Sequence, residues 1–273
     1  MNLKFKYGFY VDGHLHQVKI DLVTDKNYYK KLKKILEVKK VPGYELIRMG
    51  NTDKDGGYPM LKSFWQNNIA YSFGINNDVS WDDSMANLGY DIFMYDFTID
   101  ALPYERKEFH FFKEGIAGTN DGDPLLKTLK YFIDRNGHSK EKNMILKMDV
   151  EGWEWDFLGT VDTKTLNQFD QILIEFHDLV SSPNPKRYLK LLKKLNKTHQ
   201  LVHIHGNNCS HQVKIGDTVF ANVMEVTYVK KDKYNFADDE ELFFPTKLDF
   251  PNDKGRPDVP LGYWNKPIDF EVK

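Results

Sequence analysis

The chain has 273 residues, of which 41% are hydrophobic and 14% aromatic, and its formal net charge is −2. This length allows one large α/β domain or two small ones, and the apolar fraction excludes general disorder. Lysines are interspersed with acids rather than clustered, so the charge pattern does not predict a nucleic-acid partner.

Cys209 is the one cysteine, so an internal disulfide is excluded. This usage is typical of a reducing cytosol. The N-terminus lacks the apolar segment of a signal peptide, and no stretch approaches the roughly 18 apolar residues of a membrane helix. We therefore expect a cytoplasmic protein without a membrane span. Cys209 is expected to be a small buried residue, with a reactive thiol beside His205 and His211 as the alternative.

The pattern along the chain predicts short strands that alternate with amphipathic helices. A hairpin around Asp12-Gly13 is expected first, followed by a helix over residues 28–40. Further strands are predicted at 69–75, 91–98, 109–118, 143–150, 171–179, 200–208 and 220–230, and helices at 125–137 and 185–198. This alternation predicts an α/β fold with a mostly parallel seven-stranded sheet and helices on both faces. The last two strands have only a loop between them and can pair antiparallel.

We divide the chain into an N-terminal extension (1–42), a central domain (43–235) and a proline-rich tail (236–273). The tail has little periodicity. It nevertheless carries large apolar residues that favour packing on the body, namely Phe243, Phe244, Leu248, Phe250 and Trp264.

Polar residues follow the predicted strands where each strand ends. In an open parallel sheet, ligands bind beyond these carboxyl ends. The residues delivered there include Gly74, Asp78, Asp96, Asp149, Glu151, Glu175, His177, Asp178, His203 and His205. Gly74 would let a ligand approach the backbone, and Asp96 can accept hydrogen bonds from ribose hydroxyls. A plain helix cap is the other interpretation of such an acid.

The loop after the first of these strands discriminates between cofactors. It reads GINNDVSWDD, with one glycine instead of the G-x-G-x-x-G of a dinucleotide site. This favours S-adenosylmethionine, which has an amino-acid tail and no phosphates. An NAD-dependent oxidoreductase and a non-catalytic adenosine-cofactor-binding protein are the rival hypotheses.

Methyl transfer to a hydroxyl requires alignment and removal of a proton. His177 is the first candidate for the general base, with Asp149 or Glu175 orienting its ring, and His205 is the second. The alternatives are a structural histidine and, for Asp149, a helix cap. A Mg²⁺ or Mn²⁺ site could be built from Asp149, Glu175, His177, Asp178 and His205, but their spacing does not favour a metal.

The segments SFGINND, YDFT, GIAGT, LKMDVEGWEWDFL, LIEFHDL and HIHGNN occur in this order. Together they resemble the FkbM-like family of S-adenosylmethionine-dependent methyltransferases over roughly residues 43–260. The resemblance implies a Rossmann-like methyltransferase fold whose last strand is antiparallel, S-adenosylmethionine as cofactor, and usually O-methyl transfer. By analogy the acceptor is a sugar or sugar nucleotide of surface-glycan synthesis, with a phosphorylated small molecule as the alternative. The oligomeric state stays open, with a homodimer as one option.

The resemblance also implies which residues hold the cofactor: Gly74, Asp78, Asp96, Phe97, Ala117, Gly118, Asp55 and Tyr58. Asp78 would lie near the methionine amine and Ala117 and Gly118 near the adenine, while the loop from Asp55 to Tyr58 would cover the pocket. Trp153 departs from the family pattern. We expect it to pack between helix and sheet rather than to shape the acceptor site.

Overall fold

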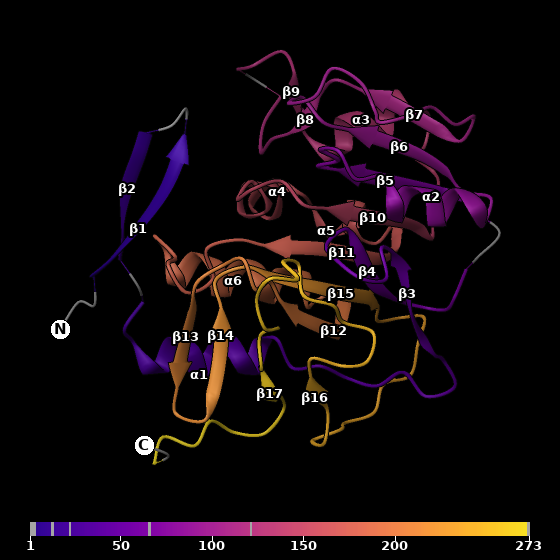
Figure 1. The fold of residues 1–273 in the computed structure, drawn as a ribbon. Coiled ribbons are helices and arrows are strands. Elements are labelled where there is room, and N and C mark those ends of the chain that lie inside the picture. The colour runs from indigo at the N-terminus through magenta and orange to yellow at the C-terminus, as the bar shows by residue number, and fades with distance from the viewer. Residues whose placement is uncertain (1–3, 12–13, 22, 65–66, 121, 272–273) are drawn as a thin grey trace.

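The computed structural model describes residues 4–11, 14–21, 23–64, 67–120 and 122–271. Its centre is a seven-stranded sheet with the order β12-β15-β11-β10-β5-β6-β7 (Figure 1). The strands are β5 (Ile69–Phe73), β6 (Asp91–Tyr95), β7 (Phe109–Phe112), β10 (Met144–Met148), β11 (Phe169–Phe176), β12 (His199–Gly206) and β15 (Met224–Lys230). Five neighbouring strands are parallel, namely β11, β10, β5, β6 and β7, whereas β15 is antiparallel to both β11 and β12. The predicted mostly parallel α/β sheet is confirmed.

The two faces of the sheet carry different layers. The helices are α1 (Lys26–Ile35), α2 (Ser80–Asn87), α3 (Leu129–Arg135), α4 (Glu154–Thr160), α5 (Thr163–Leu166) and α6 (Pro185–Leu195). Because side chains alternate along a strand, Leu146 and Met148 pack with α1, α3, α4 and α6, whereas Ile145 packs with α2 on the other face. The hairpin of β3 (Leu46–Gly50) and β4 (Gly57–Leu61) completes that second layer.

Two predicted strand regions differ from the structure. The predicted strand 109–118 divides, because β8 (Gly115–Ile116) leaves the main sheet and pairs with β9 (Leu126–Lys127). The connection between β12 and β15 is not only a loop. It contains the hairpin of β13 (Gln212–Ile215) and β14 (Thr218–Ala221), whose Val213 and Ile215 pack against the main core.

Each terminal segment contains a two-stranded sheet that is separate from the central sheet. The predicted N-terminal hairpin is formed by β1 (Lys4–Val11) and β2 (His14–Asp21), while its predicted turn residues lie outside the described residues. In the tail, β16 (Phe243–Phe244) pairs with β17 (Gly262–Tyr263). Phe244 and Trp264 are buried, and the Trp264 indole donates to the Leu36 carbonyl at 2.7 Å, whereas Phe243 is exposed. None of the described helices has the length and apolar composition to cross a membrane.

Candidate functional site

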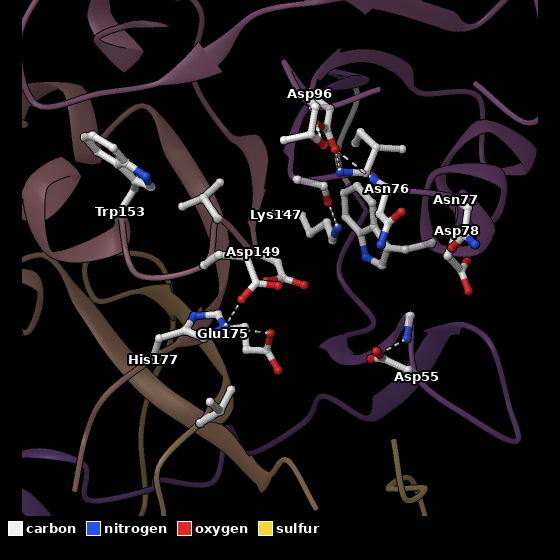
Figure 2. A pocket seen from close by; sticks show the side chains of 18 of the residues that line it. Asp55, Asn76, Asn77, Asp78, Asp96, Lys147, Asp149, Trp153, Glu175 and His177 are labelled. Atoms are coloured by element: carbon white, nitrogen blue, oxygen red, sulfur yellow. Dashed lines mark hydrogen bonds and ion pairs between the residues drawn. The ribbon is translucent and has the colours of Figure 1, made fainter. Parts of the chain in front are cut away.

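The carboxyl ends of β5, β6, β10 and β11 open into a cavity of about 720 Å³ (Figure 2). After β5 the chain builds β6 and β7 on one side and β10 and β11 on the other, so the cavity lies at the topological switch point. Nine predicted site residues line it: Asp55, Tyr58, Gly74, Asp78, Asp96, Phe97, Asp149, Glu175 and His177. Three others, Ala117, Gly118 and His205, are not among its lining residues.

Gly74 follows β5 and lines the cavity, where it contacts the backbone of Asp149 at the end of β10. Its φ is +76°, and a Cβ atom there would lie 1.6 Å from the carbonyl oxygen of Asp149. The Asp149 amide donates to the Phe73 carbonyl at 3.0 Å, and the Lys147 ammonium donates to the Gly74 carbonyl at 2.7 Å. Only a glycine fits this junction, because the backbone of Asp149 fills the space beside it. The approach of a ligand to Gly74 stays a prediction.

Asp96 organises the loop that follows Gly74. Its Oδ2 accepts hydrogen bonds from the amides of Ile75 and Asn76, both at 2.8 Å, and its Oδ1 accepts from Thr98. Burial would raise the pKa of Asp96, but the hydrogen bonds from Asn76 and Thr98 outweigh it and lower the pKa. Both carboxylate oxygens are therefore engaged with the protein, and contact with a ribose stays a prediction.

The β3–β4 hairpin forms one rim of the cavity. Asp78 joins this rim to α2, because its Oδ1 accepts from the Ser80 amide at 2.8 Å and its Oδ2 accepts from the Asn51 side chain. Asp55 is tied to the C-terminal tail, since its Oδ1 accepts from the Asn252 side chain at 3.0 Å. Two segments distant in sequence thus position the loop that was predicted to cover the pocket.

His177 follows β11 and lies among carboxylates. Its Nδ1 is 3.1 Å from Glu154 Oε1, and its Nε2 is 3.3 Å from Glu151 Oε2 and 3.6 Å from Glu175 Oε2. Burial alone would lower the pKa of His177, but hydrogen bonds to Glu151 and Glu154 outweigh it and raise the pKa to about 11. A protonated imidazole cannot accept a proton, so His177 as it stands is not the predicted general base.

Asp149 and Glu175 share the cavity floor with His177 (Figure 2). Burial raises the pKa of Asp149, and burial together with the charge of Asp149 raises that of Glu175 well above its usual value. Oδ1 of Asp149 is buried without a hydrogen-bond partner among the described residues. Glu175 accepts a hydrogen bond from the Asn207 side chain at 2.8 Å.

Of the predicted metal set, Asp149 and His177 come together, and Glu151, which was not in that set, joins them. Asp149, Glu151 and His177 each offer a ligand atom, and these atoms lie within 4.8 Å of one another. Asp178 is instead engaged, because its Oδ1 accepts from the Ser181 hydroxyl at 3.0 Å and the Asn222 amide at 3.3 Å.

His205 lies within β12 and does not reach the cavity. Its Nδ1 is 3.0 Å from Glu225 and its Nε2 is 2.9 Å from Asp258, so both ring nitrogens are occupied by carboxylates. Burial opposes this arrangement, but the two hydrogen bonds raise the pKa of His205 to about 10. The structure therefore does not support His205 as a base.

Ala117 and Gly118, predicted to lie near the adenine, do not line the cavity, and their contact with an adenine stays a prediction. Ala117 is buried, and a Cβ atom on Gly118 would lie 3.3 Å from the backbone oxygen of Asp156 in α4. Both residues follow β8, whose Gly115 and Ile116 line the cavity, and the Ala117 amide donates to the Lys127 carbonyl at 2.8 Å. Phe97 lines the cavity on this side instead, with 41% of its surface exposed.

Two interpretations of single residues were wrong. Trp153 does not pack between helix and sheet: it is 41% exposed and lines the cavity, whereas Trp155 is buried against Phe176 and Tyr188. Cys209 is exposed and lines the cavity as well. Sequence reasoning also missed Lys147, although a lysine inside the apolar run of β10 was a visible signal.

The sheet order and a polar cavity at the switch point are typical of a Rossmann-like, cofactor-binding α/β protein. The Methyltransferase FkbM domain matches residues 19–198, so the chain belongs to the FkbM methyltransferase family. This confirms the family expected from the sequence motifs and supports methyltransferase activity in general. The match begins earlier than the region where the resemblance was seen, so it includes part of the N-terminal extension, and it ends at residue 198, so it does not cover the resemblance expected over 199–260. No curated protein matches the chain.

Proposed function

We propose that this protein is an S-adenosylmethionine-dependent O-methyltransferase that methylates a hydroxyl of a polar small molecule. The observation that carries the proposal is the charge of the cavity. Six carboxyl groups line it, against three basic side chains: Asp55, Asp78, Asp96, Asp149, Glu151 and Glu175 face Lys54, Lys147 and His177. A sulfonium is a cation and is attracted to such a lining. The pyrophosphate of NAD would be repelled, by about 4 kcal/mol for one like-charged pair 4 Å apart near a protein surface.

The cofactor is proposed to lie along the Gly74 end of the cavity. Gly74 lines this end of the cavity, and the exposed ring of Phe97 offers a stacking surface for the adenine. Asp96 contributes by holding the amides of Ile75 and Asn76 in place. Asp55 and Asp78, at the β3–β4 rim, are placed to attract the amino group of the methionine part.

The acceptor is proposed to lie between Trp153 and the floor. A partly exposed indole offers a flat apolar surface with a polar edge, which suits the face of a sugar ring. Asp149 is the proposed proton acceptor, because it lines the cavity and its buried Oδ1 has no hydrogen-bond partner among the described residues. The hydroxyl oxygen attacks the methyl carbon in line with the breaking C–S bond while Asp149 takes the proton.

We propose a sugar or sugar nucleotide of surface-glycan synthesis as acceptor. A phosphorylated acceptor is less favoured, because its phosphate would meet the same carboxylates that repel NAD. A cytoplasmic location and a homodimeric state stay predictions from the sequence.

The test is a calorimetric titration of the full chain with S-adenosylhomocysteine, with NAD as the parallel ligand. Micromolar binding of S-adenosylhomocysteine and none of NAD is expected. Well-folded protein that binds no S-adenosylhomocysteine would contradict the proposal. An Asp149→Asn variant that binds S-adenosylhomocysteine and yet keeps full methyl transfer to a sugar acceptor would remove Asp149 as the proton acceptor.

A further inference from the structure

We propose that Asp149, Glu151 and His177 bind one divalent cation at the cavity floor, and that this ion holds two adjacent hydroxyl groups of a polyol acceptor. The ion site stands on the geometry of these residues alone. Its use in orienting a diol rests on the proposed function.

The distances between the donor atoms suit one ion. The ligand atoms of the three residues lie within 4.8 Å of one another, and His177 Nε2 is 3.3 Å from Glu151 Oε2. Two ligands at right angles around an ion, each about 2.2 Å from it, are separated by about 3.1 Å. Glu175 Oε2, 3.6 Å from His177 Nε2, lies close enough to provide a further oxygen.

The orientation of His177 is typical of a metal ligand. Glu154 is fully buried, and its Oε1 accepts from the Val150 and Gly152 amides at 3.0 and 3.3 Å. The same oxygen lies 3.1 Å from His177 Nδ1, and a carboxylate can only accept, so the proton lies on Nδ1. Metal-binding histidines commonly donate their second nitrogen to a carboxylate in this way. An ion at Nε2 would displace the proton that the ion-free ring carries there and shares with Glu151.

A second, independent observation points to a ligand at this place. Oδ1 of Asp149 is buried and has no hydrogen-bond partner among the described residues, although burying an unpartnered carboxylate oxygen is costly. A cation beside it removes this cost. Two or three carboxylates and one imidazole suit Mg²⁺ or Mn²⁺ better than zinc.

The ion would select acceptors with vicinal hydroxyls. Two neighbouring oxygens of a polyol can bind one ion, which places one of them for attack and makes its proton easier to remove. The covalent change is unaltered: an O–CH₃ bond forms, the C–S bond breaks with its electron pair on sulfur, and the proton goes to the carboxylate oxygen of Asp149 that does not bind the ion. Monohydroxyl acceptors would lack the second contact.

The experiment titrates metal-free full-length protein with Mn²⁺ and follows the electron paramagnetic resonance signal of the free ion. One Mn²⁺ per chain is expected, displaced by excess Mg²⁺. Glu151→Gln is expected to weaken binding at least about tenfold, because it removes one charged ligand. Glu151 is 87% exposed, so this variant will fold. Glu45→Gln, the same change at an exposed acid that does not line the cavity, is the matched control and should bind Mn²⁺ like the parent.

Folded protein that binds no Mn²⁺ would overturn the proposal, and so would Mn²⁺ binding that is unchanged in Glu151→Gln. The S-adenosylhomocysteine titration, run on the same metal-free protein, separates this result from the proposed function. Cofactor binding without Mn²⁺ binding rejects the ion site alone. Absence of cofactor binding rejects the proposed function whatever Mn²⁺ does.

Discussion

The carbonyl oxygen of Asp149 occupies the space where a side chain on Gly74 would begin, 1.6 Å from the position of its Cβ atom. This contact joins β5 to β10 at the carboxyl ends of both strands, where the cavity opens. Any residue other than glycine at position 74 must therefore separate these two strand ends.

We expect Gly74→Ala to weaken S-adenosylhomocysteine binding at least about tenfold, or about 1.4 kcal/mol, because the floor of the cavity has to move. Calorimetry measures the affinity, and thermal unfolding reports whether the variant is folded. Gly89→Ala is the matched control: Gly89 has a similar φ of +85°, but its nearest neighbour is a side-chain nitrogen at 3.5 Å. The control should lose stability from the strained φ alone, by about 1 kcal/mol, and keep its affinity. Equal affinities for the two variants would contradict the expectation.

Asp96→Asn tests whether Asp96 supports cofactor binding by holding the loop that follows Gly74. An asparagine keeps one acceptor oxygen, so its NH₂ group must face amides that now donate to the carboxylate. We expect a loss of about 2 kcal/mol in the free energy of unfolding, measured in urea, together with weaker S-adenosylhomocysteine binding. If affinity falls while stability is unchanged, Asp96 contacts the cofactor directly and the loop role is rejected.

Trp153 and Trp155 form a natural pair for comparison, since they are two residues apart and lie in opposite environments. Trp153→Ala should change the free energy of unfolding by less than about 0.5 kcal/mol and raise KM for the acceptor. Trp155→Ala should cost about 3–5 kcal/mol, because a large buried ring is removed from between Phe176 and Tyr188. An unchanged KM in the folded Trp153→Ala protein would remove Trp153 from the acceptor site.

His199 should make stability depend on pH far from the cavity. It is fully buried, with Nδ1 2.8 Å from the Thr198 hydroxyl and Nε2 3.1 Å from the Phe169 carbonyl. Burial lowers the pKa of His199 from 6.5 to about 4. The unfolded chain therefore binds the proton first, so stability is complete above pH 6.5 and falls as the pH drops towards 4, by about 3 kcal/mol.

Urea unfolding between pH 7 and 4.5 checks this expectation against a His199→Gln variant, which can both donate and accept at the same place. The difference in stability between the two proteins should shrink as the pH falls. A parallel pH dependence in both would show that His199 is not responsible.

Much of the fold was predictable because it depends on local pattern. β10 and β11 are buried along their whole length, and a strand buried on both faces reads as an unbroken apolar run. Such runs identified the parallel strands, and the residues that follow the runs, among them Gly74, Asp149 and His177, were predicted to line one cavity, as they do. The strand predicted at 109–118 is longer than β7, because the apolar pattern does not show that the chain leaves the main sheet after Phe112.

The chemistry of the histidines was not predictable in this way. His177 and His205 stand at similar places near strand ends, yet the carboxylates that surround them come from α4 and its preceding turn in one case and from β15 and the tail in the other. Asp258 is 53 residues away from His205 in sequence. The pKa of each ring depends on these partners, which no local pattern contains.

By itself, then, the sequence determined the family, the parallel sheet and the end of the sheet at which polar side chains gather, since hydrophobic periodicity and chain direction are local properties. Only the tertiary structure decided that Trp153 faces the cavity, that His205 lies outside its lining and that Asp149, Glu151 and His177 converge. The physical reason is that burial and charge act through space, between groups that the fold brings together from distant parts of the chain.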